Sequence, residues 1–435
     1  MYLQSKNSKL KLLVSLFFLC GYSVCFFGQT TSSRKLIETL SSTEMHGRGY
    51  VNKGDSIAAN FIKNQFKQRG LLPINSSYYQ KFTTPVNTFP GEMLFTVDGI
   101  KMIPAVDFLI APSSPSVQGI FQVIKIASEQ LLNPQNLMQT LFKVEDKVIL
   151  IDCYDLSKYS KTEIKLIQDV VNFLKYGDEK FGQAIVVCSA DKLTWGGATA
   201  QAVNPFFTLK KKLNIKTIEN ISINVESSFI QDYKTQNVIG YIPGISKDSV
   251  LVLTAHYDHL GRMGKDTFFP GANDNASGVA LLLQLASYFS QPENKPKYDI
   301  VCMAFAAEEI GLLGSKYFVE NPMFPLNKIK FLLNFDLAGT GDEGIKVVNA
   351  TIFKKEFDLL AAVNKKHQLL KEVKTRGESC NSDHCWFYKK GVPSFFIYTL
   401  GGTKAYHDIY DTAAQLPLSE FEDFYKLLCK YIEQL

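Results

Sequence analysis

The second half of the chain alternates apolar runs of strand length with segments of helical length, and this restricts the possible folds more than any other feature. The strand-like runs begin near residue 236 and include 248–258, 298–309, 328–339 and 392–401. The segments expected to be helical lie between or after them, at about 275–290, 312–319, 352–366, 382–390 and 418–434. This alternation indicates an α/β fold, with a mainly parallel mixed sheet flanked by helices on both faces.

Polar side chains follow several of these strands, at the point where each strand ends. Carboxyl ends of parallel strands meet at one edge of a sheet, where ligands bind. One further carboxylate stands in the glycine-rich turn "PGANDNASG", directly before a predicted helix. The candidate site residues are therefore His256, Asp258, Asp274, Glu308, Glu309, Asp336 and His407.

Taken singly, each of these residues has an ordinary explanation as a cap or a turn residue. Taken together they would gather carboxylates at the end of a buried sheet with few basic residues nearby, which is unfavourable without a counter-charge. Divalent metal ions supply that charge. Two imidazoles with three or four carboxylates suit zinc or a similar first-row ion. Five ligands are too many for one catalytic zinc and fit two ions that share a bridging carboxylate.

The motifs "TAHYDHLG", "PGANDNASG", "AFAAEEIGLLGS", "NFDLAGTG" and "YHDIYDT" resemble, in that order, the active-site motifs of the zinc aminopeptidase family M28. The resemblance covers about 34–85 and 234–435. It implies two Zn²⁺ per chain, with Asp274 as the bridge between them. His256 and Asp336 complete one implied site, and Glu309 and His407 complete the other. Glu308 is implied to be the general base for a hydroxide that bridges the two zinc ions.

Further residues of these motifs have expected supporting roles. Asp258, two residues after His256 on an extended strand, is placed to hold the second ring nitrogen of that histidine. Tyr406 resembles a tyrosine that some family members use to stabilise the tetrahedral intermediate. Asp383 and His384 resemble pocket-shaping residues of the family. The alternative for His384 is that it binds metal. The glycines that permit the turn and close packing around Asp274 are Gly271 and Gly278, and the histidines expected in ordinary surface or turn positions are His46, His259 and His367.

The predicted domain organisation has four parts. The first contains three lysines before an apolar stretch, which is typical of a signal peptide, with an uncleaved membrane anchor as the alternative. The third is β-rich and loosely resembles the protease-associated insert of the same family. The parts are residues 1–28 (signal peptide), 29–89 (N-terminal helices of the peptidase domain), 90–232 (inserted domain) and 233–435 (peptidase core).

The charge and the cysteine content restrict the possible binding partners and the cellular compartment. The formal charge is +5, but the predicted signal peptide holds three of the lysines, so the remainder is close to neutral. No block of like charges indicates a nucleic-acid partner. Export to the periplasm or the extracellular space is expected, without stable membrane insertion after cleavage. Export permits disulfides, and Cys380 and Cys385 are close enough in sequence to form one.

The predicted function is a secreted zinc exopeptidase that acts on peptide substrates. Aminopeptidase action rests on the resemblance alone. The alternatives are a carboxypeptidase or a glutaminyl-cyclase-like enzyme on the same fold, or a binding or receptor-like relative without catalysis. The complete ligand set disfavours both the one-zinc cyclase and the non-catalytic relative.

Overall fold

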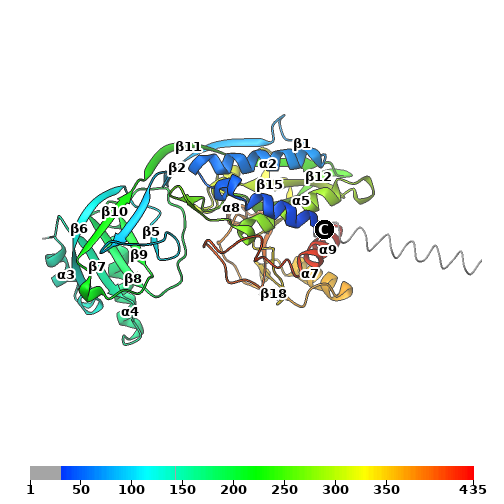
Figure 1. Cartoon of the computed structure of the whole chain (residues 1–435). Helices are drawn as coiled ribbons and strands as arrows, with labels where there is room; N and C mark the ends of the chain where they lie inside the picture. Colours follow the sequence, from blue (N-terminus) through cyan, green and yellow to red (C-terminus); the bar gives the residue numbers. More distant parts are fainter. Residues whose placement is uncertain (1–30, 143) are drawn as a thin grey trace, which may run out of the picture.

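Two sheets, carried by two domains that lie side by side, make up the molecule (Figure 1). The computed structural model describes residues 31–142 and 144–435. The segment predicted as a signal peptide therefore lies outside the described residues. Across the part of the chain that is described, none of the helices combines the length and the apolar character needed to traverse a bilayer.

The larger sheet belongs to the domain that contains the candidate site strands. Its strands are β1 (Leu72–Pro73), β2 (Tyr79–Thr88), β11 (Ser228–Ile242), β12 (Ser246–His256), β15 (Tyr298–Phe305), β16 (Ile329–Phe335), β17 (Ile345–Val348), β18 (Val373–Thr375) and β19 (Ser394–Thr399). Their order is β1-β11-β15-β12-β16-β19-β17-β18, and β2 also pairs with β11. The central strands β15, β12, β16 and β19 are parallel, whereas β11 and β17 are antiparallel to their neighbours β15 and β19. The predicted mainly parallel mixed sheet is confirmed.

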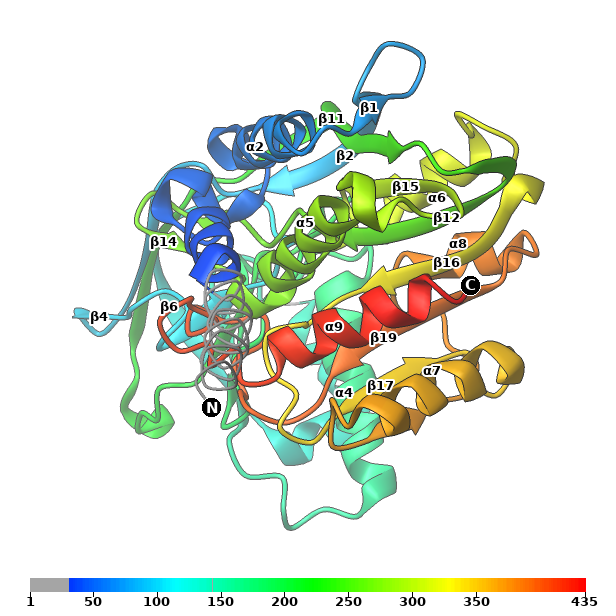
Figure 2. The same ribbon diagram turned by 90° about the vertical axis from the view of Figure 1, so that its right-hand side faces the viewer.

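Helices cover both faces of this sheet because its strands are apolar on both sides. Leu251 and Leu253 of β12 pack into the core on one face, and Val252 between them packs into the core on the other. The first face carries α2 (Gly54–Gln68), α5 (Gly278–Phe289), α7 (Lys354–His367) and α9 (Phe421–Ile432), and the second carries α6 (Leu313–Glu320) and α8 (His384–Lys389). Figure 2 shows α2, α5, α9 and α7 in a row across the first face.

The inserted domain has an eight-stranded sheet of its own. Its strands are β3 (Met93–Val97), β4 (Ile100–Lys101), β5 (Phe108–Ile110), β6 (Val117–Ala127), β7 (Val148–Cys153), β8 (Ala184–Ser189), β9 (Phe206–Leu209) and β10 (Asn220–Val225), in the order β4-β3-β10-β6-β7-β8-β9-β5. Two helices, α3 (Pro134–Leu141) and α4 (Lys161–Tyr176), pack on one face of it. The other face encloses a second apolar core.

The two domains are joined by more than a linker. The chain leaves the domain of the larger sheet along β2 and returns along β11, and these two strands pair antiparallel as a long ribbon (Figure 1). The loop after β12 forms a short hairpin of β13 (Arg262–Met263) and β14 (Thr267–Phe268). Leu260, Met263 and Phe269 of this segment are buried in the apolar core of the inserted domain. The inserted domain is therefore packed against the loop that follows one of the site strands.

Candidate metal centre

The candidate ligands meet at the carboxyl-terminal edge of the larger sheet. His256 is the last residue of β12 and pairs with Phe305, the last residue of the neighbouring parallel strand β15. Glu308 and Glu309 come shortly after β15, and Asp336 directly follows β16. Because these parallel strands end at the same edge, their register delivers the side chains to one place.

Asp274 reaches this edge from the turn before α5 and lies between two histidines. Its Oδ1 is 3.4 Å from Nε2 of His256, and its Oδ2 is 3.1 Å from Nε2 of His407. Asp336 Oδ2 is 3.4 Å from the same nitrogen of His256, and Glu309 Oε2 is 3.1 Å from that of His407. Two groups therefore share Asp274, one with His256 and Asp336 and the other with His407 and Glu309.

The distances between these donor atoms fit divalent ions. Atoms that surround an ion tetrahedrally at the zinc–nitrogen distance of about 2.0–2.1 Å lie about 3.3 Å from one another. The observed separations are 3.4 Å in one group and 3.1 Å in the other. Asp336 Oδ1 is buried and has no hydrogen-bond partner in the described part of the chain. Imidazole and carboxylate are a donor set of zinc and related ions, so the residues present fit a two-ion centre.

The electrostatics of the centre favour a cation. Burial by itself lowers the pKa of His256, yet the carboxylates of Glu308 and Asp336 raise it well above its usual value. Burial also lowers the pKa of His407, but nearby carboxylates, mainly that of Glu309, raise this pKa to about 11. A raised histidine pKa means that the surroundings stabilise positive charge at the ring. Divalent ions between the same donors would supply that charge.

Glu308 and Glu309 are neighbours in sequence but lie in opposite environments. Burial raises the pKa of Glu308 well above its usual value, and the charges of Asp383 and Glu309 add to the shift. Burial alone would also raise the pKa of Glu309, but His407 and His259 bring it well below the usual value. Glu309 is therefore the ionised member of the pair, and Glu308 is the one that accepts a proton readily.

Asp258 lies beside His256, as predicted, but its carboxylate has a different task. The ring Nδ1 of His256 lies 3.2 Å from the backbone carbonyl of Asp258 and 3.8 Å from its carboxylate Oδ1. That carboxylate accepts the backbone N–H groups of Glu308 (3.1 Å) and Glu309 (3.3 Å). Strand β12 ends at His256, so the regular alternation behind the prediction no longer holds at Asp258. The residue fixes the backbone of the glutamate pair.

His259 is a residue of the centre that sequence reasoning missed, and its assignment to an ordinary surface or turn position is wrong. Its side chain is buried, and Nδ1 lies 2.6 Å from Oε1 of Glu309. With Asp274 and Glu309 it forms a group whose donor atoms lie within 4.8 Å of one another. Its place in the sequence, directly after His256, Tyr257 and Asp258, could have indicated that it lies near the centre. His46 is half-buried and contacts Arg262 at 3.2 Å, and His367 is exposed at the end of α7.

Two buried charged side chains hold the backbone of Asp274. The guanidinium of Arg48 donates to the carbonyls of Gly271 at 2.7 Å and of Asp274 at 3.0 Å. It is fully buried and donates to three further carbonyls, those of Leu40, Tyr257 and Pro270. On the other side, Asp411 accepts the backbone N–H of Asp274 at 2.9 Å. Arg48 was also not predicted, although it stands in the "HGRGY" segment.

The two glycines of the turn are required because a larger residue would overlap neighbouring atoms. A Cβ at Gly271, whose φ is +59°, would lie 2.2 Å from the carbonyl oxygen of Asp274. A Cβ at Gly278 would lie 2.2 Å from Oδ1 of Asn275 and 2.8 Å from the carbonyl oxygen of Phe335. The expectation that Gly271 and Gly278 permit close packing around Asp274 is confirmed.

The remaining predicted residues surround the centre at different depths. Tyr406 is 45% exposed and stacks on His407, with ring centroids 4.0 Å apart. Asp383 is fully buried, and burial is the main cause that raises its pKa to about 7, against the opposing charge of His256. His384 directs Nε2 to the carbonyl of Ser379 at 2.9 Å, so it belongs to neither ligand group. Cys380 and Cys385 enclose this segment in a disulfide.

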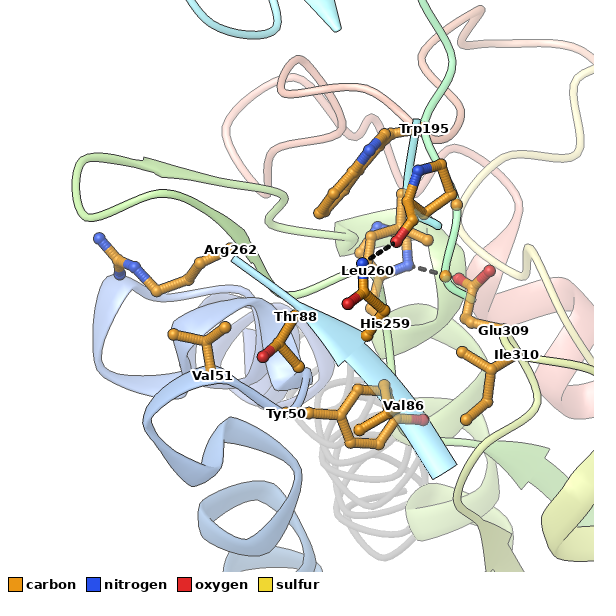
Figure 3. Close-up of a pocket in the computed structure, with 14 residues that line it drawn as sticks. Tyr50, Val51, Val86, Thr88, Trp195, His259, Leu260, Arg262, Glu309 and Ile310 are labelled. Atoms are coloured by element: carbon orange, nitrogen blue, oxygen red, sulfur yellow. Dashed lines mark hydrogen bonds and ion pairs between the residues drawn. The ribbon is translucent and has the colours of Figure 1, made fainter. Parts of the chain in front are cut away.

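A small pocket lies next to Glu309 and is lined by residues of both domains (Figure 3). Its volume is about 20 Å³, which is room for one water molecule. Figure 3 shows His259 directed toward Glu309, with Ile310 on one side and Trp195 of the inserted domain on the other. The centre is therefore bordered by the inserted domain.

Known families provide an independent comparison. Residues 237–432 match the profile of peptidase family M28. This region belongs to peptidase family M28. This confirms the resemblance carried by the motifs, and the matched M28 region contains all five residues of the two ligand groups.

Two of three named relatives of the M28 region are called aminopeptidases. Leupeptin-inactivating enzyme 1 of Streptomyces exfoliatus is 34% identical over 185 residues, which are 41% of this chain and 38% of that protein. Aminopeptidase YwaD of Bacillus subtilis (strain 168) is 30% identical over 166 residues, 37% of this chain and 34% of that protein. A probable leucine aminopeptidase of Trichophyton verrucosum (strain HKI 0517) is 31% identical over 225 residues, 48% of this chain and 58% of that protein. The match thus spans between 34% and 58% of the length of these relatives.

Solved structures match the M28 chain over nearly its whole length. BSAP, a zinc aminopeptidase from Bacillus subtilis, superposes with a TM-score of 0.67 at 17% identity and covers 93% of this chain and 94% of that one. A peptidase M28 precursor from Shewanella amazonensis SB2B gives a TM-score of 0.69 at 17% identity and covers 92% of both chains. The fold, including the inserted domain, is therefore that of M28 proteins.

Proposed function

We propose that the protein is a zinc-dependent aminopeptidase that holds two Zn²⁺ per chain and removes N-terminal residues from peptides. The observation that carries the proposal is the position of Asp274, whose two carboxylate oxygens face two separate groups of donors. Membership of family M28 supports peptide hydrolysis. The aminopeptidase assignment draws on the names of YwaD and BSAP.

Each ion would be held by three residues. One would bind His256, Asp274 and Asp336, and the other would bind Asp274, Glu309 and His407. Zinc ions in such a centre lower the pKa of water and polarise a carbonyl group. His259 and Asp258 keep Glu309 in place, one through its side chain and the other through its backbone.

Glu308 is the proposed general base. Its backbone is held by Asp258, and its carboxylate lies within the buried group of acids around His256. We propose that this carboxylate takes a proton from the attacking water and delivers it to the leaving amine. Tyr406, stacked on His407 and half-exposed, is the proposed donor to the oxygen that gains negative charge during attack.

A substrate comparison tests the aminopeptidase assignment. The zinc-loaded protein is assayed with chromogenic amino-acid amides, with the same amides blocked at the α-amine, and with peptides that report release of the C-terminal residue. We expect turnover of the free amides alone. Release of C-terminal residues would instead identify a carboxypeptidase. Cyclisation of N-terminal glutamine would identify a cyclase, and no turnover of any substrate would favour a binding protein.

We also propose that the protein is exported to the periplasm or the extracellular space. The support is the basic and apolar character of residues 1–28 and the disulfide between Cys380 and Cys385, because disulfides persist in oxidising compartments. Cell fractionation with mass spectrometry of the intact chain checks this. The expected product lacks about the first 28 residues and lies outside the cytoplasm, whereas a full-length cytoplasmic chain would contradict the proposal.

A further inference from the structure

His407 lies farther from the end of a strand than His256, Glu309 and Asp336 do. It lies in the loop after β19, half-buried, in a left-handed backbone conformation with φ +52°. Asp274 and Glu309 face its Nε2, and the ring of Tyr406 stacks on it. The tautomer of the ring depends on what contacts the opposite nitrogen, Nδ1.

That contact comes from the inserted domain. Nδ1 of His407 lies 3.0 Å from the backbone carbonyl of Trp195, and the backbone N–H of Trp195 donates to the carbonyl of His407 at 2.9 Å. A carbonyl can only accept, so in the neutral ring Nδ1 carries the proton, and the lone pair of Nε2 is left for a ligand. Trp195 thus selects the tautomer that a metal-binding histidine needs at this position.

Trp195 is itself fixed to both domains. Its indole Nε1 donates to the carbonyl of Ile110 in the inserted sheet at 2.8 Å. Its ring stacks on Phe269, which belongs to the loop after β12, with centroids 4.8 Å apart. The side chain is 7% exposed. The tryptophan is therefore a rigid support and not a surface contact.

Lys192 attaches the same segment a second time. Its Nζ lies 2.7 Å from Oδ2 of Asp408, the residue after His407. It also donates to the carbonyls of Lys404 at 2.8 Å and Tyr406 at 3.1 Å. These contacts bind residues 192–195 to the whole loop that carries the histidine.

We propose that the inserted domain is a working part of the metal centre, and that residues 192–195 position His407 for the second ion. Trp195 and Lys192 are positioning residues, since they act through His407. This inference rests on the proposed two-zinc site.

Zinc affinity tests the inference without an assay of activity. Apoprotein variants Trp195→Ala and Lys192→Ala are titrated with zinc against a competing chelator. Lys158→Ala is the matched control, because Lys158 pairs with Glu129 within the inserted domain and is exposed. Trp195→Ala keeps the carbonyl that contacts His407 but removes the indole that holds it in place, so we expect one of the two ions to bind up to about 10-fold more weakly, the lower end of the effect of losing a partner of a ligand histidine. Lys192→Ala should show a smaller loss at the same site.

The outcomes separate the inference from the proposed function. Two zinc ions in the wild type, with unchanged affinities in both variants, would overturn the positioning role alone. A wild type that binds no zinc would overturn the proposed function and this inference together. Lys192→Ala leaves the packed indole in place, so it keeps the test available if Trp195→Ala does not fold. Unfolding temperatures of all variants in chelator serve as the control for global stability.

Discussion

At the scale of single residues, one pair of neighbours performs two different tasks. Glu309 is held by His259 and His407, whereas Glu308 has carboxylates around it and a raised pKa. The backbone of both is fixed by Asp258. Two adjacent carboxylates can therefore be buried because only one of them needs to be ionised in the absence of metal.

Substitution Glu308→Gln tests this division of tasks. The amide keeps the shape but cannot accept a proton, so we expect kcat to fall by about 10²–10⁴-fold while both zinc ions remain bound. Steady-state kinetics and metal analysis measure the two effects. Glu320→Gln, an exposed site at the end of α6, is the control. Unchanged turnover in Glu308→Gln would remove its role as base.

Arg48 is the second residue from which a clear prediction follows. Substitution Arg48→Met removes the donors of five buried carbonyls, and each buried group left unpaired costs about 1–3 kcal/mol. We expect a loss of roughly 3 kcal/mol or more in the free energy of unfolding, and weaker zinc binding because the Asp274 turn loosens. Denaturant unfolding and zinc titration measure these effects.

Arg69→Met is the matched control for Arg48→Met. Arg69 also donates to carbonyls, those of Leu283 and Gln65, but is partly exposed and lies away from the centre. It should lose less stability and keep its zinc affinity. Equal effects of the two substitutions would show that Arg48 has no special connection to the metal centre.

At the scale of elements, the turn before α5 is the connection that sets the geometry. It places Asp274 between two histidines and is surrounded by Arg48, Asp411 and two glycines. Gly271→Ala tests how tightly it is packed. Alanine at positive φ costs about 1–2 kcal/mol by itself. The overlap with the carbonyl of Asp274 should add about 1–3 kcal/mol and reduce zinc affinity.

Gly70→Ala separates the cost of the positive φ from the cost of the steric overlap. Gly70, after α2, has a φ of +79° and open space where the Cβ would stand, whereas Gly271 has a φ of +59° and no space. Gly70→Ala should therefore show the conformational cost alone. A stability loss at Gly271 no larger than that at Gly70 would contradict the close packing of the turn.

At the scale of the whole molecule, the centre gathers negative charge in the interior. Six carboxylates, those of Asp258, Asp274, Glu308, Glu309, Asp336 and Asp383, lie in its buried surroundings. Removal of the proposed zinc ions by a chelator would take away the counter-charge of these carboxylates. We expect the unfolding temperature to fall on chelation and to recover when zinc is added back. Free zinc at about 100 times its Kd corresponds to about 2.7 kcal/mol of stabilisation.

Calorimetry in chelator and in zinc measures this effect, with Asp336→Asn as the comparison. That variant lacks one ligand of one ion, so its gain on adding zinc should be smaller than that of the wild type. An unfolding temperature that does not respond to either treatment would argue against bound ions. The weaker binding of one ion that we expect in Trp195→Ala is also an effect on the whole molecule, because Trp195 lies in the inserted domain and the ion would be bound in the other domain.

Much of this fold and centre could be predicted from the sequence. The apolar periodicity indicated the strands and helices, and the polar residues at strand ends indicated His256 and Asp336 because parallel strands end together. The five ligands also stand in short motifs. Both kinds of information are local, so they needed no knowledge of distant contacts.

The partners of those ligands depended on tertiary structure. Asp258 contacts His256 through its backbone carbonyl because the strand has ended, and the fold of the loop buries His259 against Glu309. Arg48 and Trp195 reach the centre from segments more than 200 residues away from their contacts at Asp274 and His407. Sequence by itself determined which atoms can bind metal, since that is a property of side-chain chemistry. The tertiary structure decided how those atoms are aimed, since hydrogen bonds to backbone carbonyls leave no pattern in the residues that accept them.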